Sequence, residues 1–365
     1  MQIKHANYAV HALLFFGLQA CADDMPSMHG DDHAGSAVAL DAGVEIDARA
    51  GSAPDAQVRT PPDAQVAQDP PLASGPKAYI GLFGDGAIAV FDVIAKKVLK
   101  TIPVTAPDGL IITPDGKKVY VSSADTGSVK VINTVDDSLT TSVAVGPKPA
   151  GLAITPDGRS VVVAVGGADE AVVIDVASDT VTRHVPVGQA HASCITKDGH
   201  YAYVGSQVIA SPSIVVVDLS GSETPKTISV DKAPRMLACE TDRIYFTAVG
   251  LDSVEVLDPV SGKLGAPIPT GGSPHDVRAG QTSQTELVVS QTSGDLEFID
   301  APTATVISKV TTGKLAHWIT LSADRAIAYV TNEGDDNVSF VDLKSQTVIA
   351  SVPVGKAPRK MAIQP

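Results

Sequence analysis

Short runs of apolar residues separated by turn residues recur from residue 77 to the end of the chain. Each run is rich in Val, Ile, Thr and Tyr and is bounded by Gly, Pro or Asp, which is typical of β-strands. The four kinds of run in one repeating unit are seen at 150–154, 118–123, 128–132 and 138–145. The first kind ends in a turn such as Thr155-Pro156-Asp157-Gly158, where Pro and Gly suit a tight turn. The pattern therefore predicts units of four antiparallel strands.

The end of the third strand shows the repeat most clearly. An apolar residue followed by Asp or Asn occurs in seven units, at Phe91-Asp92, Ile132-Asn133, Ile174-Asp175, Val217-Asp218, Leu257-Asp258, Ile299-Asp300 and Val341-Asp342. Successive copies lie 40 to 43 residues apart. A period of that length, with strands in every unit, is typical of propeller blades and not of helical solenoids. Because these Asp residues repeat, we expect them to form turns and not a site.

The two ends of the repeat array complete one another. The array opens at 77–105 with the second, third and fourth strands of a unit, and it ends with a lone first strand at 359–363. A last strand that joins the first blade would close the ring and remove its open edge. We therefore predict an all-β, seven-bladed β-propeller over 77–365, with four antiparallel strands per blade and the C-terminal strand in the N-terminal blade.

One four-residue motif gives a resemblance to a known family. It reads Tyr329-Val330-Thr331-Asn332, with variants at 120–123, 203–206 and 245–248, Thr-Pro-Asp-Gly turns at 113–116 and 155–158, and Val-Gly-x-x-Pro links at 145–149 and 354–358. These features resemble the YVTN-family β-propeller repeat of bacterial and archaeal surface proteins. The resemblance implies the fold over about 290 residues. It leaves function open, because the family mixes surface-layer components, binding proteins and relatives of lactonases and oxidoreductase subunits.

The first 21 residues predict export. Lys4 and His5 precede a short apolar core from Tyr8 to Leu18, which is too short to span a bilayer. The following Leu18-Gln19-Ala20-Cys21 resembles a bacterial lipobox, in which Cys21 receives the lipid. The alternative is an ordinary secretory signal with an incidental cysteine. We expect an exported lipoprotein held by its acyl chains at the outer membrane, the cell surface or the periplasmic face, without a membrane-spanning helix.

Residues 22–76 are rich in Ala, Asp, Pro and Gly and have almost no large apolar side chains. Such a segment cannot bury enough surface to offset chain entropy, so we predict a disordered linker. Within it, 25–33 contains two Met, two His and two Asp, which are ligands for a soft or borderline metal. The alternative for this patch is a polar linker without a metal.

The net charge of −14 excludes a sequence-independent grip on nucleic-acid phosphates, which needs clustered Lys and Arg. We expect a monomer whose partner is a small anionic ligand or a protein.

The candidate site is the mouth of the central channel, because first strands line the channel of a propeller. The residue after each Val-Gly-x-x-Pro link does not repeat; the seven are Asp108, Ala150, His191, Arg235, His275, His317 and Arg359, with Trp318 beside His317.

Two kinds of ligand suit this set. His191, His275 and His317 could together bind Zn or Cu. However, Arg235 and Arg359 flank two of these histidines, and fixed positive charges disfavour a bound metal ion. The same set suits an anion, because Arg supplies charged, forked donors and His adds donors that depend on pH.

Cys194 and Cys239 fall in neighbouring first strands. Exported proteins meet oxidising conditions, so the two can form a disulfide; two buried free thiols are the alternative.

Three functions remain open at this point. The first is a non-catalytic, lipid-anchored propeller that binds a ligand or partner at its channel mouth. The second is a lactonase-like or other hydrolase with a histidine-bound metal in the channel. The third is a copper-handling or redox accessory protein. The sequence favours the first, because it shows no nucleophile–base pair and Asp108 is the one acid among the irregular positions.

Overall fold

The computed structural model describes residues 75–365, except 241 and 283. The predicted lipidation site Cys21, the signal over 1–21 and nearly all of the linker over 22–76 lie outside these residues. In the part that is described, no helix is long and apolar enough to cross a membrane.

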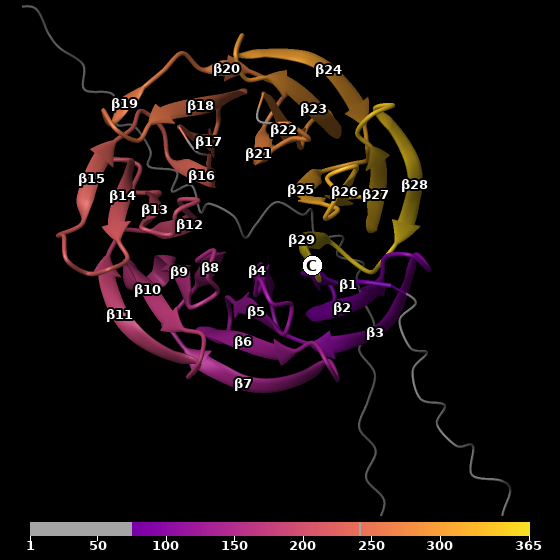
Figure 1. The fold of residues 1–365 in the computed structure, drawn as a ribbon, viewed down its shortest axis with the longest axis horizontal. Helices are drawn as coiled ribbons and strands as arrows, with labels where there is room; N and C mark the ends of the chain where they lie inside the picture. The colour runs from indigo at the N-terminus through magenta and orange to yellow at the C-terminus, as the bar shows by residue number, and fades with distance from the viewer. Residues whose placement is uncertain (1–74, 241, 283) are drawn as a thin grey trace, which may run out of the picture. The chain divides into compact units, whose positions relative to one another are not determined.

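Residues 77–365 form a seven-bladed β-propeller, so the predicted fold class is confirmed. Figure 1 shows the blades arranged around a central axis, each with its strands ordered from the inside outwards. Blade 1 contains β29 (Pro358–Ile363), β1 (Lys77–Leu82), β2 (Ala87–Asp92) and β3 (Lys97–Pro103). Blade 2 contains β4 (Pro107–Ile112), β5 (Lys118–Ser123), β6 (Ser128–Asn133) and β7 (Ser138–Ala144). Blade 3 contains β8 (Pro149–Ile154), β9 (Ser160–Val165), β10 (Glu170–Asp175) and β11 (Thr180–Pro186), with the 3-10 turn η1 (Gly166–Ala168) between β9 and β10.

The remaining four blades follow the same order. Blade 4 contains β12 (Ala190–Ile195), β13 (Tyr201–Ser206), β14 (Ser213–Asp218) and β15 (Lys226–Ser229). Blade 5 contains β16 (Pro234–Cys239), β17 (Ile244–Ala248) and β18 (Ser253–Asp258), and its outer strand is split into β19 (Lys263–Leu264) and β20 (Ile268–Pro269). Blade 6 contains β21 (Pro274–Ala279), β22 (Thr285–Ser290), β23 (Asp295–Asp300) and β24 (Thr305–Thr311). Blade 7 contains β25 (Ala316–Leu321), β26 (Ile327–Asn332), β27 (Asn337–Asp342) and β28 (Thr347–Pro353).

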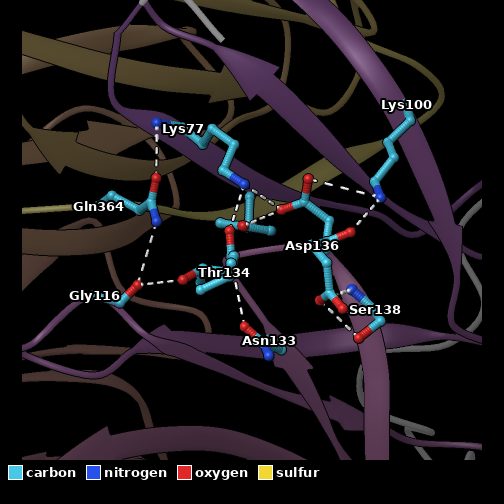
Figure 2. Close-up of polar contacts among 11 residues, drawn as sticks. Lys77, Lys100, Gly116, Asn133, Thr134, Asp136, Ser138 and Gln364 are labelled. Carbon is cyan, nitrogen blue, oxygen red and sulfur yellow. Dashed lines mark hydrogen bonds and ion pairs between the residues drawn. The ribbon is translucent and has the colours of Figure 1, made fainter. Parts of the chain in front are cut away.

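The ring closes as the two ends of the repeat array predicted. β29 pairs antiparallel with β1, so the last strand is the innermost strand of the first blade. Gln364 then ties this blade to blade 2: its Oε1 accepts from the backbone N–H of Lys77, and its Nε2 donates to the carbonyl of Gly116, both at 3.3 Å (Figure 2). On the same interface the Lys77 ammonium lies 2.7 Å from Asp137.

The apolar core lies between neighbouring blades. Aromatic and branched side chains of the second and third strands fill it, and the largest fully buried ones include Tyr79, Tyr120, Phe91 and Phe246. The repeated acids at the third-strand ends cap local turns, as expected: Asp175 accepts from the N–H of Ser178, and Asp342 accepts from that of Ser345. These repeating residues therefore build the scaffold. Candidate functional residues are instead found at the positions of the innermost strands that do not repeat.

Candidate functional site

The central channel is the space between the seven innermost strands. Each of the seven residues compared in the sequence is the second residue of such a strand, so the register read from the Val-Gly-x-x-Pro links is right. The pairing of every innermost strand with its neighbour also shifts close to this residue, as between Pro274 and Asp276 or between Ala316 and Trp318. A β-bulge re-aims side chains locally. The bulge thus occurs where the chain carries its irregular polar residues.

The Thr or Ser at the third position of the four-residue motif supports this position from the neighbouring blade. Thr331 Oγ1 donates to the carbonyl of Arg359 at 2.6 Å, and Thr247 Oγ1 donates to that of His275 at 2.8 Å. Ser122 makes the same bond to Ala150 at 2.7 Å. Each bond satisfies a backbone carbonyl that the bulge removes from the regular ladder. The motif therefore fixes the backbone beneath the second-position side chains.

Two of the three candidate histidines are buried against each other. His275 and His317 are 3% and 5% exposed, and their ring centroids are 3.8 Å apart. The Nδ1 atoms of both rings have no hydrogen-bond partner among the described residues. The sequence placed both at an open mouth; the structure buries them because adjacent inner strands, β21 and β25, stack the two rings. His191 is half-buried.

Burial and nearby positive charges keep all three imidazoles neutral. Loss of solvation, followed by the charges of the surrounding basic residues, holds the pKa of His275 and that of His317 well below the ordinary value. The pKa of His191 is lowered to about 4, mainly by burial, although Asp108 opposes this shift. At neutral pH these rings therefore supply hydrogen-bonding groups and no charge.

Glu333, which the sequence comparison did not single out, pairs with the second-position residues of two blades. Its Oε1 lies 3.1 Å from Nε of Arg359, and its Oε2 lies 3.8 Å from Nε2 of His317. The Arg359 guanidinium also stacks on the ring of Phe83 at 3.5 Å. On the other side of His275, Arg235 donates to Ser273 Oγ at 3.4 Å. His275, His317, Glu333 and Arg359 thus form one connected series of contacts within the second-position ring.

The network does not form the predicted three-histidine metal site. The described residues contain no group of three or more His, Cys, Asp or Glu side chains placed to hold a metal ion. Arg235 and Arg359 also lower the histidine pKa values by their charge, and the same charges would repel a metal cation. The residues present therefore do not fit Zn or Cu at His191, His275 and His317.

A cavity of about 450 Å³ occupies the channel beyond this ring. All seven innermost strands line it, through residues such as Leu110, Gly151, Ala192, Met236 and Ala362. None of the second-position residues is among its lining. This cavity therefore lies next to the predicted site and does not include it.

The floor of the cavity is built from Trp318 and two basic residues. The guanidinium carbon of Arg278 lies 4.1 Å from the Trp318 ring centroid, and the ammonium of Lys360 lies 4.6 Å from it. The two cations come from the blades on either side of Trp318. Asp276 Oδ2 accepts from Nε of Arg278 and from the N–H of Ile319, both at 3.1 Å. Asp276 therefore holds Arg278 in place, and together with Asp108 it acts on the charge of Lys360.

Lys360 has no acceptor for its ammonium. The residue is 4% exposed, and within the described part of the chain it makes no hydrogen bond or ion pair; its ammonium lies against the Trp318 ring. Burial is the main cause that lowers the pKa of Lys360, and Asp108 and Asp276 partly offset it. The ammonium itself is reachable from the cavity, which Lys360 lines, so an anion bound there would supply an acceptor.

The rim of the cavity is also basic. Lys197 pairs with Glu240 at 2.5 Å, and Arg325 donates through Nε to the carbonyl of Gly280 at 2.9 Å. Of the five charged residues that line the cavity, four are basic: Lys197, Arg278, Arg325 and Lys360, against Glu240. Positive potential in this cavity would attract anions to a protein that is acidic as a whole.

The cysteines form part of the cavity wall. Cys194 and Cys239 are joined by a disulfide with a Cα–Cα distance of 5.6 Å, which links the innermost strands of blades 4 and 5. Of the two alternatives left by the sequence, the structure has the bridge.

Sequence reasoning brought Trp318 to the site but missed Arg278, Lys360 and Asp276. A signal was present: the third positions of the innermost strands are also irregular, reading Gly109, Gly151, Ala192, Met236, Asp276, Trp318 and Lys360. Small residues occupy this position in blades 2 and 3, where the strands approach closely; a Cβ on Gly151 would lie 2.8 Å from the carbonyl oxygen of His191. The charged floor is therefore confined to blades 6, 7 and 1.

Comparisons with known proteins agree on the fold. No protein-family model and no curated protein matches the sequence. Among solved structures, a functionally unknown protein from Desulfotomaculum acetoxidans is 13% identical with a TM-score of 0.68, covering 79% of this chain and 99% of its own. A candidate 6-phosphogluconolactonase from Bacteroides fragilis is 14% identical with a TM-score of 0.65, covering 81% and 99%. Hydrazine synthase from Kuenenia stuttgartiensis is 20% identical with a TM-score of 0.61, covering 69% and 87%. These similarities show a shared propeller fold.

Proposed function

We propose that this propeller is a non-catalytic binding protein for a small anionic ligand, which it holds in the channel cavity. The observation that carries the proposal is the ammonium of Lys360. The residue is 4% exposed and lines the cavity, and its ammonium has no hydrogen-bond acceptor among the described residues. An anion in the cavity would supply that acceptor in a desolvated site, where charge-assisted bonds are strong.

Arg278 and the basic rim extend this interaction. The Nε of Arg278 is used by Asp276, but its terminal nitrogens have no bond within the described residues. Arg278 and Lys360 both lie against one indole ring, so a single anionic group can reach both cations. Lys197 and Arg325 at the rim would guide the anion inwards.

Membership of the YVTN-type repeat family, export and a lipid anchor at Cys21 belong to the same proposal. The motif residues support the family assignment, because they form the inter-blade bonds of Thr331, Thr247 and Ser122. The lipobox-like segment ending at Cys21 supports export. In this view the propeller captures its ligand outside the cytoplasm.

A hydrolase is the weaker alternative. It is suggested by fold similarity to a candidate lactonase, and such similarity alone does not carry function. The described residues offer no metal group in the channel, and two of its acids, Asp276 and Glu333, are engaged by arginines.

The experiment uses the intrinsic fluorescence of Trp318, the single tryptophan of the sequence, which lines the cavity. The protein is titrated with acetate, inorganic phosphate and hexanoate at constant ionic strength. We expect saturable binding of at least one anion. Lys360→Met should weaken it at least tenfold, since it removes the desolvated cation while keeping a similar volume.

Lys344→Met is the matched control, because Lys344 is exposed in the turn after β27. It should bind as the unchanged protein does. Calorimetry on the same samples separates binding from a change in fluorescence alone. The proposal is wrong if none of the anions binds, or if Lys360→Met binds them as tightly as the unchanged protein.

A further inference from the structure

We infer that the ligand is a monocarboxylate with an apolar body, and not a sugar acid or an inorganic anion. This inference rests on the proposed function and adds the chemical class of the ligand. It follows from three properties of the cavity: the free cationic donors of its floor, the side chains of its walls and its size.

Two cationic groups of the floor have free donors. Asp276, which is 1% exposed, is bonded to Nε of Arg278, and Asp108 and Asp276 both act on the charge of Lys360, but the terminal nitrogens of Arg278 and the ammonium of Lys360 have no acceptor among the described residues. With both carboxylates nearby, a dianion would add more buried negative charge than a monoanion. A carboxylate has two oxygens, so one can accept from the Lys360 ammonium and the other from the free nitrogens of Arg278.

Above the floor, the wall side chains are mostly apolar. They include Ile111, Ile112, Ala153, Ile154, Ile195, Ala238, Leu321 and Ala362. Two polar side chains of the wall are Ser193 and Thr320. Thr320 Oγ1 is used by the carbonyl of Met361 at 2.7 Å, while Ser193 Oγ is buried without a partner in the described part of the chain.

A ligand covered with hydroxyl groups would leave most of them facing these side chains, and each buried polar group without a partner costs binding energy. Ser193 and the free backbone edges of the inner strands could satisfy some of them, but the apolar wall side chains could not. An apolar body instead removes the walls from water. The wall chemistry therefore disfavours a sugar acid and favours a hydrocarbon body.

The size of the cavity points the same way. A volume of about 450 Å³ is within the range of pockets that hold small organic molecules, and it greatly exceeds the needs of an acetate or phosphate ion. A carboxylate seated on the floor would leave space next to Ile154 and Ile195 that only its body can fill. Each buried methylene should then tighten binding by about threefold to fourfold.

The test is a homologous series of probes followed by Trp318 fluorescence and by calorimetry. Acetate, butanoate, hexanoate and octanoate vary the apolar body at constant charge. Gluconate has the six carbons of hexanoate but carries hydroxyl groups, and hexanol has the body without the charge. We expect affinity to rise along the series, with gluconate and hexanol each at least tenfold weaker than hexanoate.

A wall variant locates the effect in the cavity. Ile154→Thr should weaken hexanoate severalfold and leave acetate unchanged, because only the longer ligand reaches the wall. Ile349→Thr is the matched control, since Ile349 lies on the outer strand β28 and is 51% exposed. Circular dichroism of both variants shows whether the fold is kept; a misfolded Ile154→Thr is replaced by Ile195→Thr.

The outcomes separate this inference from the proposed function. Equal affinity for gluconate and hexanoate, or no gain in affinity from acetate to octanoate, contradicts the inference that the ligand has an apolar body. Binding that depends on Lys360 would still support an anion site in that case. Tight binding of hexanol overturns the need for a carboxylate. If none of the anions binds in a Lys360-dependent way, the proposed function itself fails.

Discussion

The hydroxyl of Thr331 donates a hydrogen bond of 2.6 Å to the backbone carbonyl of Arg359. Thr331 belongs to the repeated motif of blade 7, and Arg359 occupies the irregular second position of the innermost strand in blade 1. The bond therefore connects the most regular part of the sequence to one of its least regular positions. The repeat fixes the backbone at the channel, and the individual blades then place different side chains on it.

Thr331→Val should reduce stability while keeping the side-chain shape. The change leaves the Arg359 carbonyl without its donor, and a buried polar group that loses its partner costs about 1–3 kcal/mol. Urea denaturation measures the loss. Thr101→Val is the control, because Thr101 is exposed on the outer strand β3 and should change stability little. Equal free energies of unfolding for the two variants would show that the hydrogen bond of Thr331 does not stabilise the fold.

Removal of the disulfide should destabilise the propeller substantially. Cys194 and Cys239 close a loop of 45 residues, for which the loop-entropy relation gives about 4 kcal/mol. A Cys194→Ala, Cys239→Ala double variant should therefore unfold at lower urea concentration. Addition of a reductant should shift the unchanged protein and not the variant. A shift of both by the same amount would mean that the reductant acts elsewhere.

Glu286 should make stability decline with rising pH. The residue is 3% exposed, its Oε2 has no partner among the described residues, and burial, followed by the charge of Glu240, raises its pKa to about 8. The raised pKa means that the folded protein binds the Glu286 proton more tightly than the unfolded chain does. This contribution to the free energy of unfolding is fully present below the pKa of a Glu in the unfolded chain, and it is lost as pH rises through about 8. The loss amounts to a few kcal/mol.

Denaturation between pH 5 and pH 9 measures this effect. Glu286→Gln keeps the shape and cannot ionise, so its stability should depend less on pH. Lys197, Arg243 and Arg325 also act on Glu286, and their charges remain in the variant. An identical pH dependence for both proteins would contradict a protonated Glu286.

Anion binding should weaken as pH rises, at a lower pH than an ordinary lysine would require. The lowered pKa of Lys360 means that its ammonium loses its proton early, although a bound anion raises the pKa again. The histidines should not contribute, because their lowered pKa values keep them neutral at and above neutral pH. Titrations with hexanoate from pH 6 to pH 10 check both points. A loss of affinity centred near pH 6.5 would assign the charge to histidine instead.

The sequence predicted the scaffold better than the site, for a physical reason. A repeated pattern determines the number of blades, the closure of the ring and the position of the second residue in each innermost strand. Because the pattern occurs seven times, an irregular copy does not hide it. The floor depends on Lys360 and Trp318, whose positions follow the bulge, and a bulge re-aims side chains in a way that composition does not reveal. The burial of His275 depends on its neighbour His317, and so on how closely β21 and β25 pack.

The closure of the ring also bears on chain connectivity. The backbone N–H of Gln364 donates to the carbonyl of Lys77 at 2.9 Å, so the two ends of the propeller are hydrogen-bonded neighbours in one sheet. No blade is then physically the first. A circular permutant that joins these ends by a short linker and opens the chain in the exposed loop between β14 and β15 should therefore still form the ring. The same ring should thus form whichever blade is synthesised first.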